Sequence, residues 1–105
     1  MEFEYLRNKT QPDEPSLTQM VRAAIQILQK EPNGFHLVVE GGRIDHAHHD
    51  GMARLALHDL VEFDNAIEMA LSMVPEEESL FVGRSLNLTK FYHIHTKLMI
   101  FCDLQ

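Results

Sequence analysis

One short segment constrains the fold of this chain more than any other. An apolar run ends in a carboxylate, two glycines follow, and then come an acid and three histidines, in the order Val38-Val39-Glu40-Gly41-Gly42-Arg43-Ile44-Asp45-His46-Ala47-His48-His49-Asp50. A short apolar run bounded by glycines is typical of a buried strand, and polar groups just beyond a strand end lie where α/β proteins gather their functional groups. The segment therefore predicts a strand, a turn and the start of a helix, with Glu40 at the strand end.

The residues before this segment predict a helix and a strand. Ser16 is an expected N-cap, and Gln19 completes a capping-box pattern before a stripe of apolar residues at helical spacing. The break at Pro32-Asn33-Gly34 ends this helix, and Phe35–Val39 then predicts a buried strand in a parallel sheet. Residues 1–15 are expected to be extended or turn-like, because prolines, Asn and Asp punctuate them. This order of elements favours an α/β fold.

Composition excludes several classes of function. The chain has 105 residues, enough for one small domain at most, and a net charge of −7 with scattered acids, so it has no basic face for nucleic acid. Its apolar stretches are too short for a transmembrane segment. A single cysteine, Cys102, offers no disulfide framework. The first residues lack the features of a signal peptide, so a cytosolic product is expected if Met1 is the true start.

The polar residues after the glycines have the spacing of metal ligands. Asp45 and His49 are four residues apart and would point from one face of a helical turn. A carboxylate oxygen and an imidazole nitrogen suit zinc, whereas Glu40 offers a hard oxygen better matched to magnesium. His46 and His48 cannot share the face of His49. From residue types alone, a solvated histidine-rich loop with incidental metal affinity remains the alternative.

The run from Val39 to Asp50 closely resembles the metal-binding segment of animal alkaline phosphatases. The flanks agree, because Pro15–Met20, Pro32–Phe35 and Ala56–Ile67 are similar to the helix, strand and helix around that segment in the family. The resemblance spans roughly residues 3–80. It implies that residues 1–80 are a fragment of the three-layer alkaline-phosphatase-like α/β fold. Residues 81–105 lack the resemblance and are predicted to be a divergent tail that is not native to the fold.

The resemblance also implies a function and a set of site residues. The family hydrolyses phosphate monoesters through a phosphoseryl intermediate at a centre of two zinc ions and one magnesium. By position, Glu40 corresponds to a magnesium ligand, Asp45 and His49 to ligands of one zinc, and His46 to a residue that reaches bound phosphate through water. Glu14 falls where animal members use an aspartate to help bind a structural calcium, and the extra methylene puts calcium binding there in doubt.

One position departs from the family's motif. Ala47 stands where the family usually has glycine. If that glycine adopts a positive φ, alanine strains the turn. If the position lies inside a helical turn, alanine is harmless or favourable.

Other parts of the family's centre have no counterpart here. The nucleophilic serine segment is missing, so no catalytic residue is assigned, and the chain diverges after Ser79-Leu80 where ligands of the second zinc would follow. His93 and His95 alternate like strand residues but lack the family's context. The chain alone is therefore expected to be inactive. It is also expected to be marginally ordered, since the strand at 35–39 would lack sheet neighbours. A non-catalytic small metal-binding or interaction module is the alternative function.

The family resemblance extends to partners and location. It implies phosphate monoesters as the substrate class and a homodimer as the assembly. Animal members are typically exported and held at the outer cell surface by a lipid anchor, so the parent protein is expected to be extracellular.

Overall fold

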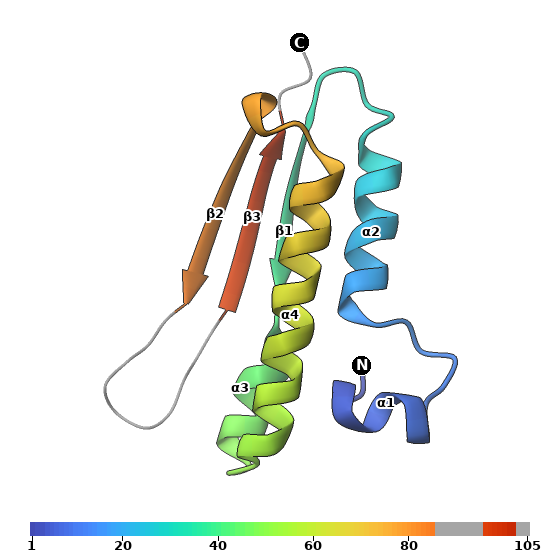
Figure 1. The fold of residues 1–105 in the computed structure, drawn as a ribbon, viewed down its shortest axis with the longest axis vertical. Coiled ribbons are helices and arrows are strands. Elements are labelled where there is room, and N and C mark those ends of the chain that lie inside the picture. Colours follow the sequence, from blue (N-terminus) through green and yellow to red (C-terminus); the bar gives the residue numbers. More distant parts are fainter. Residues whose placement is uncertain (86–95, 103–105) are drawn as a thin grey trace.

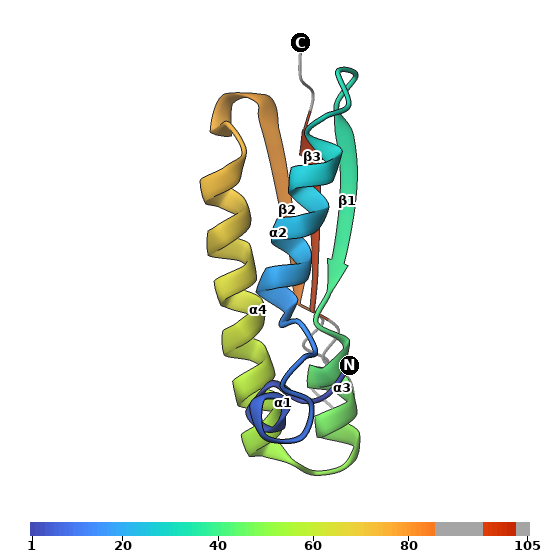
Figure 2. The same ribbon diagram turned by 90° about the vertical axis from the view of Figure 1, so that its right-hand side faces the viewer.

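The computed structural model describes residues 1–85 and 96–102, and shows an α/β arrangement of helices beside a small sheet (Figure 1). Its elements are α1 (Glu4–Thr10), α2 (Leu17–Leu28), β1 (Phe35–Glu40), α3 (Gly42–His49), α4 (Ala53–Met73), a 3-10 turn (Glu76–Glu78), β2 (Ser79–Ser85) and β3 (Thr96–Cys102). The helices α2 and α4 lie on the same side of the sheet (Figure 2). The described residues therefore form two layers, and the mixed α/β class expected from the sequence is confirmed.

Helix α2 begins where its capping residues predict. The Ser16 hydroxyl accepts a hydrogen bond from the Gln19 backbone N–H at 3.3 Å, and the Gln19 side chain accepts one from the Ser16 backbone N–H at 2.8 Å. Both bonds satisfy backbone donors that the first helical turn leaves without partners. The helix ends at Leu28, before the predicted break at Pro32-Asn33-Gly34.

The N-terminal segment corrects one expectation. Residues 1–15 are not extended or turn-like throughout, because Glu4–Thr10 form helix α1. Glu4 and Arg7 form an ion pair one turn apart, at 2.8 Å, and Phe3 at the N-cap is buried against the core. The ion pair and the packing of Phe3 support this helical turn, and the turn-forming prolines do not oppose it because they lie beyond its end.

The sheet corrects the predicted strand pairing. Its order is β1-β3-β2, and β3 pairs antiparallel with both neighbours, from Phe35 opposite Cys102 to Glu40 opposite Lys97 along β1. β1 therefore does not lie in a parallel neighbourhood and does not lack a partner. The motif-based reading failed here because β3 comes from the segment after residue 80, whose pairing is a long-range contact that local patterns do not encode.

β1 is half-buried rather than buried on both faces. Phe35, Leu37 and Val39 face the helices, whereas Val38 on the opposite face is 51% exposed. This alternation has the period of two that a strand imposes. The sequence predicts a fully buried strand because Val38 and Val39 are both β-branched and apolar, and the apolar run itself does not show which face meets the helices.

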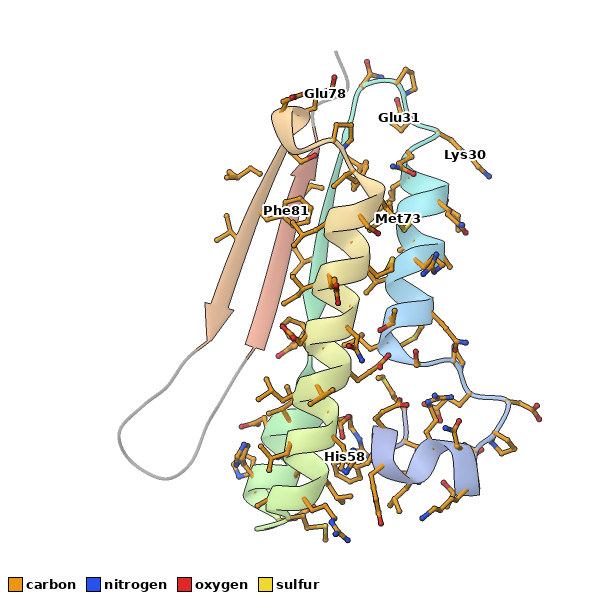
Figure 3. All side chains as sticks on the ribbon, in the orientation of Figure 1. Lys30, Glu31, His58, Met73, Glu78 and Phe81 are labelled. Atoms are coloured by element: carbon orange, nitrogen blue, oxygen red, sulfur yellow. The ribbon has the colours of Figure 1, made fainter. Side chains whose placement is uncertain are left out.

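The core lies between α2, α4 and the helix-facing side of the sheet. Ile25 of α2 and Ile44 of α3 are its largest fully buried side chains, and Phe63 of α4 is 3% exposed. Phe81 of β2 packs against the edge of this core, and Figure 3 labels it. The core is therefore shared by α2, by α3 with its polar residues, and by α4.

The predicted boundary between residues 80 and 81 falls inside β2. This boundary, and the foreign origin of the segment beyond it, stay predictions. His93 and His95 lie outside the residues that the structure describes.

Candidate metal centre

The turn between β1 and α3 depends on a close approach at Gly41. A Cβ atom at this position would lie 3.0 Å from the Ile44 Cδ1 atom and 3.2 Å from the Phe63 Cδ2 atom. Both distances are shorter than ordinary van der Waals contact. Glycine at 41 therefore lets the chain turn tightly against α4, so that α3 starts immediately after the strand.

Asp45 and His49 converge on one face of α3, as their spacing predicts. The Asp45 Oδ2 and His49 Nε2 atoms are 3.4 Å apart, and the Asp45 side chain is 13% exposed while that of His49 is 46% exposed. Two ligands on a tetrahedral zinc ion, each about 2.1 Å from the metal, would be separated by roughly 3.4 Å. The pair therefore fits two adjacent corners of a zinc coordination sphere, with His49 on the solvent side.

Glu40 lies at the end of β1, one residue before the turn, and its side chain is on the exposed face of the strand. Its Cγ atom is 3.9 Å from the position of a Cβ at Gly42, so the side chain lies over the start of α3. Within residues 1–85 and 96–102, no group of three or more His, Cys, Asp or Glu side chains gathers around one point. The structure thus brings Asp45 and His49 together and leaves Glu40 outside that pair.

His46 points to a different partner from His49. Its Nδ1 atom lies 3.3 Å from the Nη1 atom of Arg43. Arg43 in turn lies 3.9 Å over the Phe3 ring and 3.5 Å from the Glu2 carboxylate. A guanidinium only donates hydrogen bonds, so in this contact the His46 Nδ1 atom accepts. The N-terminal segment thereby holds Arg43, and Arg43 orients His46.

Comparisons with known proteins bear directly on this segment. The family model described as alkaline phosphatase matches residues 1–92. The tissue-nonspecific alkaline phosphatase of Homo sapiens is 52% identical over 81 residues, which cover 77% of this chain and 16% of that protein. The chain belongs to the alkaline phosphatase family. This match extends to residue 92, beyond residue 80, where the resemblance of the motifs stops.

Other alkaline phosphatases are similar over two thirds or more of the chain. That of Gadus morhua is 49% identical over 80 residues, 76% of this chain and 16% of that protein. The membrane-bound alkaline phosphatase of Bombyx mori is 49% identical over 69 residues, 66% of this chain and 12% of that protein. The chain thus spans less than a fifth of the length of these relatives. No solved structure matches it.

The structure decides between the two readings of Ala47. This residue lies inside α3 and is fully buried among apolar side chains, with no positive φ. Alanine is the best helix former and costs less conformational entropy than glycine. The departure from the glycine usual in alkaline phosphatases is therefore compatible with the helical turn that carries Asp45 and His49.

Glu14, the candidate calcium ligand, has protein partners instead. Its Oε1 atom accepts a hydrogen bond from the Glu2 backbone N–H at 2.8 Å and lies 3.5 Å from the N-terminal amine. Its backbone carbonyl accepts one from Arg7 at 2.9 Å. In this structure Glu14 therefore links the N-terminal residues and α1 to the segment that precedes α2. Calcium binding there stays a prediction.

Asp59 is a buried carboxyl that the sequence reading missed. It lies on α4, is 6% exposed, and accepts a long hydrogen bond of 3.4 Å from the Glu4 backbone N–H. Burial raises the pKa of Asp59 to about 6, although the Glu4 N–H and the Arg43 charge act in the opposite direction. The sequence does indicate that Asp59 is buried, because it shares the apolar helix face of Ala56, Phe63 and Ala66.

Within the described part of the chain, no helix is both long and apolar enough to cross a bilayer.

Proposed function

We propose that this chain supplies part of the metal centre of an alkaline phosphatase, which hydrolyses phosphate monoesters through a phosphoseryl intermediate. One observation carries the proposal. Asp45 and His49 belong to the family's metal-binding segment, and their ligand atoms lie 3.4 Å apart on one face of α3. That separation suits two ligands of a tetrahedral zinc ion.

The proposed roles follow the family resemblance. Asp45 and His49 hold one zinc, and Glu40 is a ligand of the magnesium. Such ions supply the charge neutralisation that phosphoryl transfer requires. His46, held by Arg43 at its Nδ1 atom, keeps its Nε2 atom available to reach a phosphate through water.

The exposed face of the sheet is evidence that a further layer of the fold covers it. Val38 of β1 and Leu80 of β2 are 51% and 59% exposed, and each alternates along its strand with a residue that packs against the core, Leu37 and Phe81. Apolar side chains on an uncovered face are typical of a surface that another layer covers. We propose that this face meets the third layer of the alkaline phosphatase fold.

The partners and location of the parent protein belong to the same proposal. By family resemblance it acts as a homodimer, outside the cell and attached by a lipid anchor. The name of the Bombyx mori relative, membrane-bound alkaline phosphatase, supports an association with membranes.

Zinc binding tests the proposed ligand pair. We expect chelator-treated chain to bind zinc weakly in calorimetric titrations, because catalytic zinc sites usually have three protein ligands and this pair supplies two. Asp45→Ala or His49→Ala should each weaken binding by about tenfold or more, since removing even an outer partner of a ligand typically costs 10–100-fold.

His48→Ala is the matched control, because His48 lies on the same helix and on a different face. Equal losses in all three variants would indicate incidental histidine affinity and contradict the assignment. Tight one-to-one binding would favour the alternative of a small metal-binding module.

The chain by itself should not turn over p-nitrophenyl phosphate when assayed with zinc and magnesium at alkaline pH. By the family resemblance, no serine of this chain matches the nucleophile, and only two residues match ligands of one zinc. The chain therefore lacks several of the groups that phosphoryl transfer requires. A full-length alkaline phosphatase is the positive control. Turnover by the purified chain that Asp45→Ala abolishes would refute this expectation.

A further inference from the structure

Lysine, arginine and histidine side chains surround Tyr5, where α1 meets α4. The Lys9 Nζ atom lies 4.8 Å from the centre of the Tyr5 ring, and the Arg54 guanidinium carbon lies 5.4 Å from it. The His58 ring lies 4.8 Å from the same ring, centre to centre, at an angle of 42°. Figure 3 shows His58 on α4 where this helix passes α1. Two helices thus bring three nitrogen-bearing side chains to one aromatic ring.

The charges in this cluster are not neutralised locally. Among the described residues, Arg7 and Arg43 have carboxylate partners, whereas neither Lys9 nor Arg54 lies within 4.0 Å of one. Helix α4 also has no acidic residue in its first turn, where Arg54 lies. The cluster is therefore a positive patch on a chain whose net charge is −7.

An aromatic face attracts cations, but the cations still repel one another. An oxyanion bound between them would relieve this repulsion. The available donors suit such a ligand, because the lysine offers three N–H groups, the arginine a planar fork and the histidine a ring N–H. The hydroxyl of Tyr5, on the same ring, is a fourth donor group.

We propose that Tyr5, Lys9, Arg54 and His58 form a binding site for a phosphate oxyanion, either free or at the end of a monoester. The site uses α1 and α4 and contains none of the proposed metal ligands on β1 and α3. It therefore works without zinc or magnesium, and it supplies binding rather than chemistry.

Titration of the full chain with inorganic phosphate tests this site. Chelator is present throughout and ionic strength is held constant with sodium chloride, so that neither metals nor bulk screening contribute. Saturable binding is expected, with backbone amide shifts in two-dimensional NMR spectra that concentrate at residues 5–9 and 54–58. Arg54→Gln should weaken binding by about tenfold, and Lys9→Gln should act in the same direction, because each removes charge-assisted hydrogen bonds.

Arg22→Gln is the matched control, since Arg22 is an exposed arginine on α2, outside the cluster. A second titration uses glycerol 2-phosphate. Binding of both ligands indicates a site for a terminal phosphate group, and binding of inorganic phosphate alone indicates a site for the free ion. Absence of saturable binding, or an Arg22→Gln loss equal to that of Arg54→Gln, would overturn the proposal. Because no metal is present, this result does not depend on the outcome of the zinc titration.

Discussion

Phe63→Ala is expected to lower the free energy of unfolding by about 3–5 kcal/mol, the range for removal of a buried aromatic ring. Phe63 is 3% exposed, and its ring lies beneath Gly41 at the turn into α3. The loss is a large share of the roughly 5–15 kcal/mol that stabilises an ordinary domain. Urea unfolding followed by circular dichroism at 222 nm measures it.

The same substitution should also affect the metal centre. Phe63 supports the turn that positions α3, so its removal should weaken zinc binding although it is not a ligand. Leu57→Ala is the control on the same helix, because Leu57 is 62% exposed and its truncation should change stability by no more than about 0.5 kcal/mol. Equal effects of the two substitutions would show that Phe63 does not pack as the structure describes.

Asp59 should make the fold less stable as the pH rises. Its pKa is about 6 in the folded chain and 3.8 for an unperturbed aspartate, so the folded state holds its proton over a range in which the unfolded state has lost it. Stability from this group is complete below pH 3.8 and declines as the pH passes through about 6. The full change is on the order of 2–3 kcal/mol, at about 1.4 kcal/mol for each unit.

Asp59→Asn should remove this dependence. Asparagine does not ionise, and its carbonyl oxygen can still accept the hydrogen bond from the Glu4 N–H. The variant should match the parent near pH 3.5 and be more stable by about 1–3 kcal/mol at pH 8. Thermal unfolding across this pH range measures the difference in unfolding free energy between the two proteins. Other titrating groups contribute equally to both proteins, so their effects cancel in this difference.

Asp64→Asn is the matched control for Asp59, because Asp64 is an exposed acid on the same helix. Its substitution should leave the pH profile of stability nearly unchanged. An Asp59→Asn profile parallel to that of the parent chain would contradict the buried, proton-holding state of Asp59.

The correct predictions concern residues that are close in sequence. The Ser16–Gln19 capping box and the Asp45–His49 pair both join residues within one helical turn. Their geometry follows from helix periodicity as soon as the segment is helical, so spacing alone predicts which atoms meet. The resemblance to alkaline phosphatases added the chemical roles, which residue types left open.

The missed features depend on contacts between distant residues. β3 pairs with β1 across more than fifty residues, and nothing in Phe35–Val39 indicates an antiparallel partner. The N-terminal segment reaches α3 through the contact of Phe3 with Arg43, and α4 through the contact of Tyr5 with His58. The local turn signals before α2 did not reveal these contacts.

Sequence by itself thus determined the order helix, strand, turn and helix, and the one-turn spacing that points Asp45 and His49 the same way. Local backbone geometry and capping are encoded within a few residues. Only the tertiary structure decided which face of β1 is covered, which strand pairs with it, and that Asp59 is buried near Arg43. Burial, strand pairing and pKa depend on what surrounds a residue in space, and packing brings those surroundings from far along the chain.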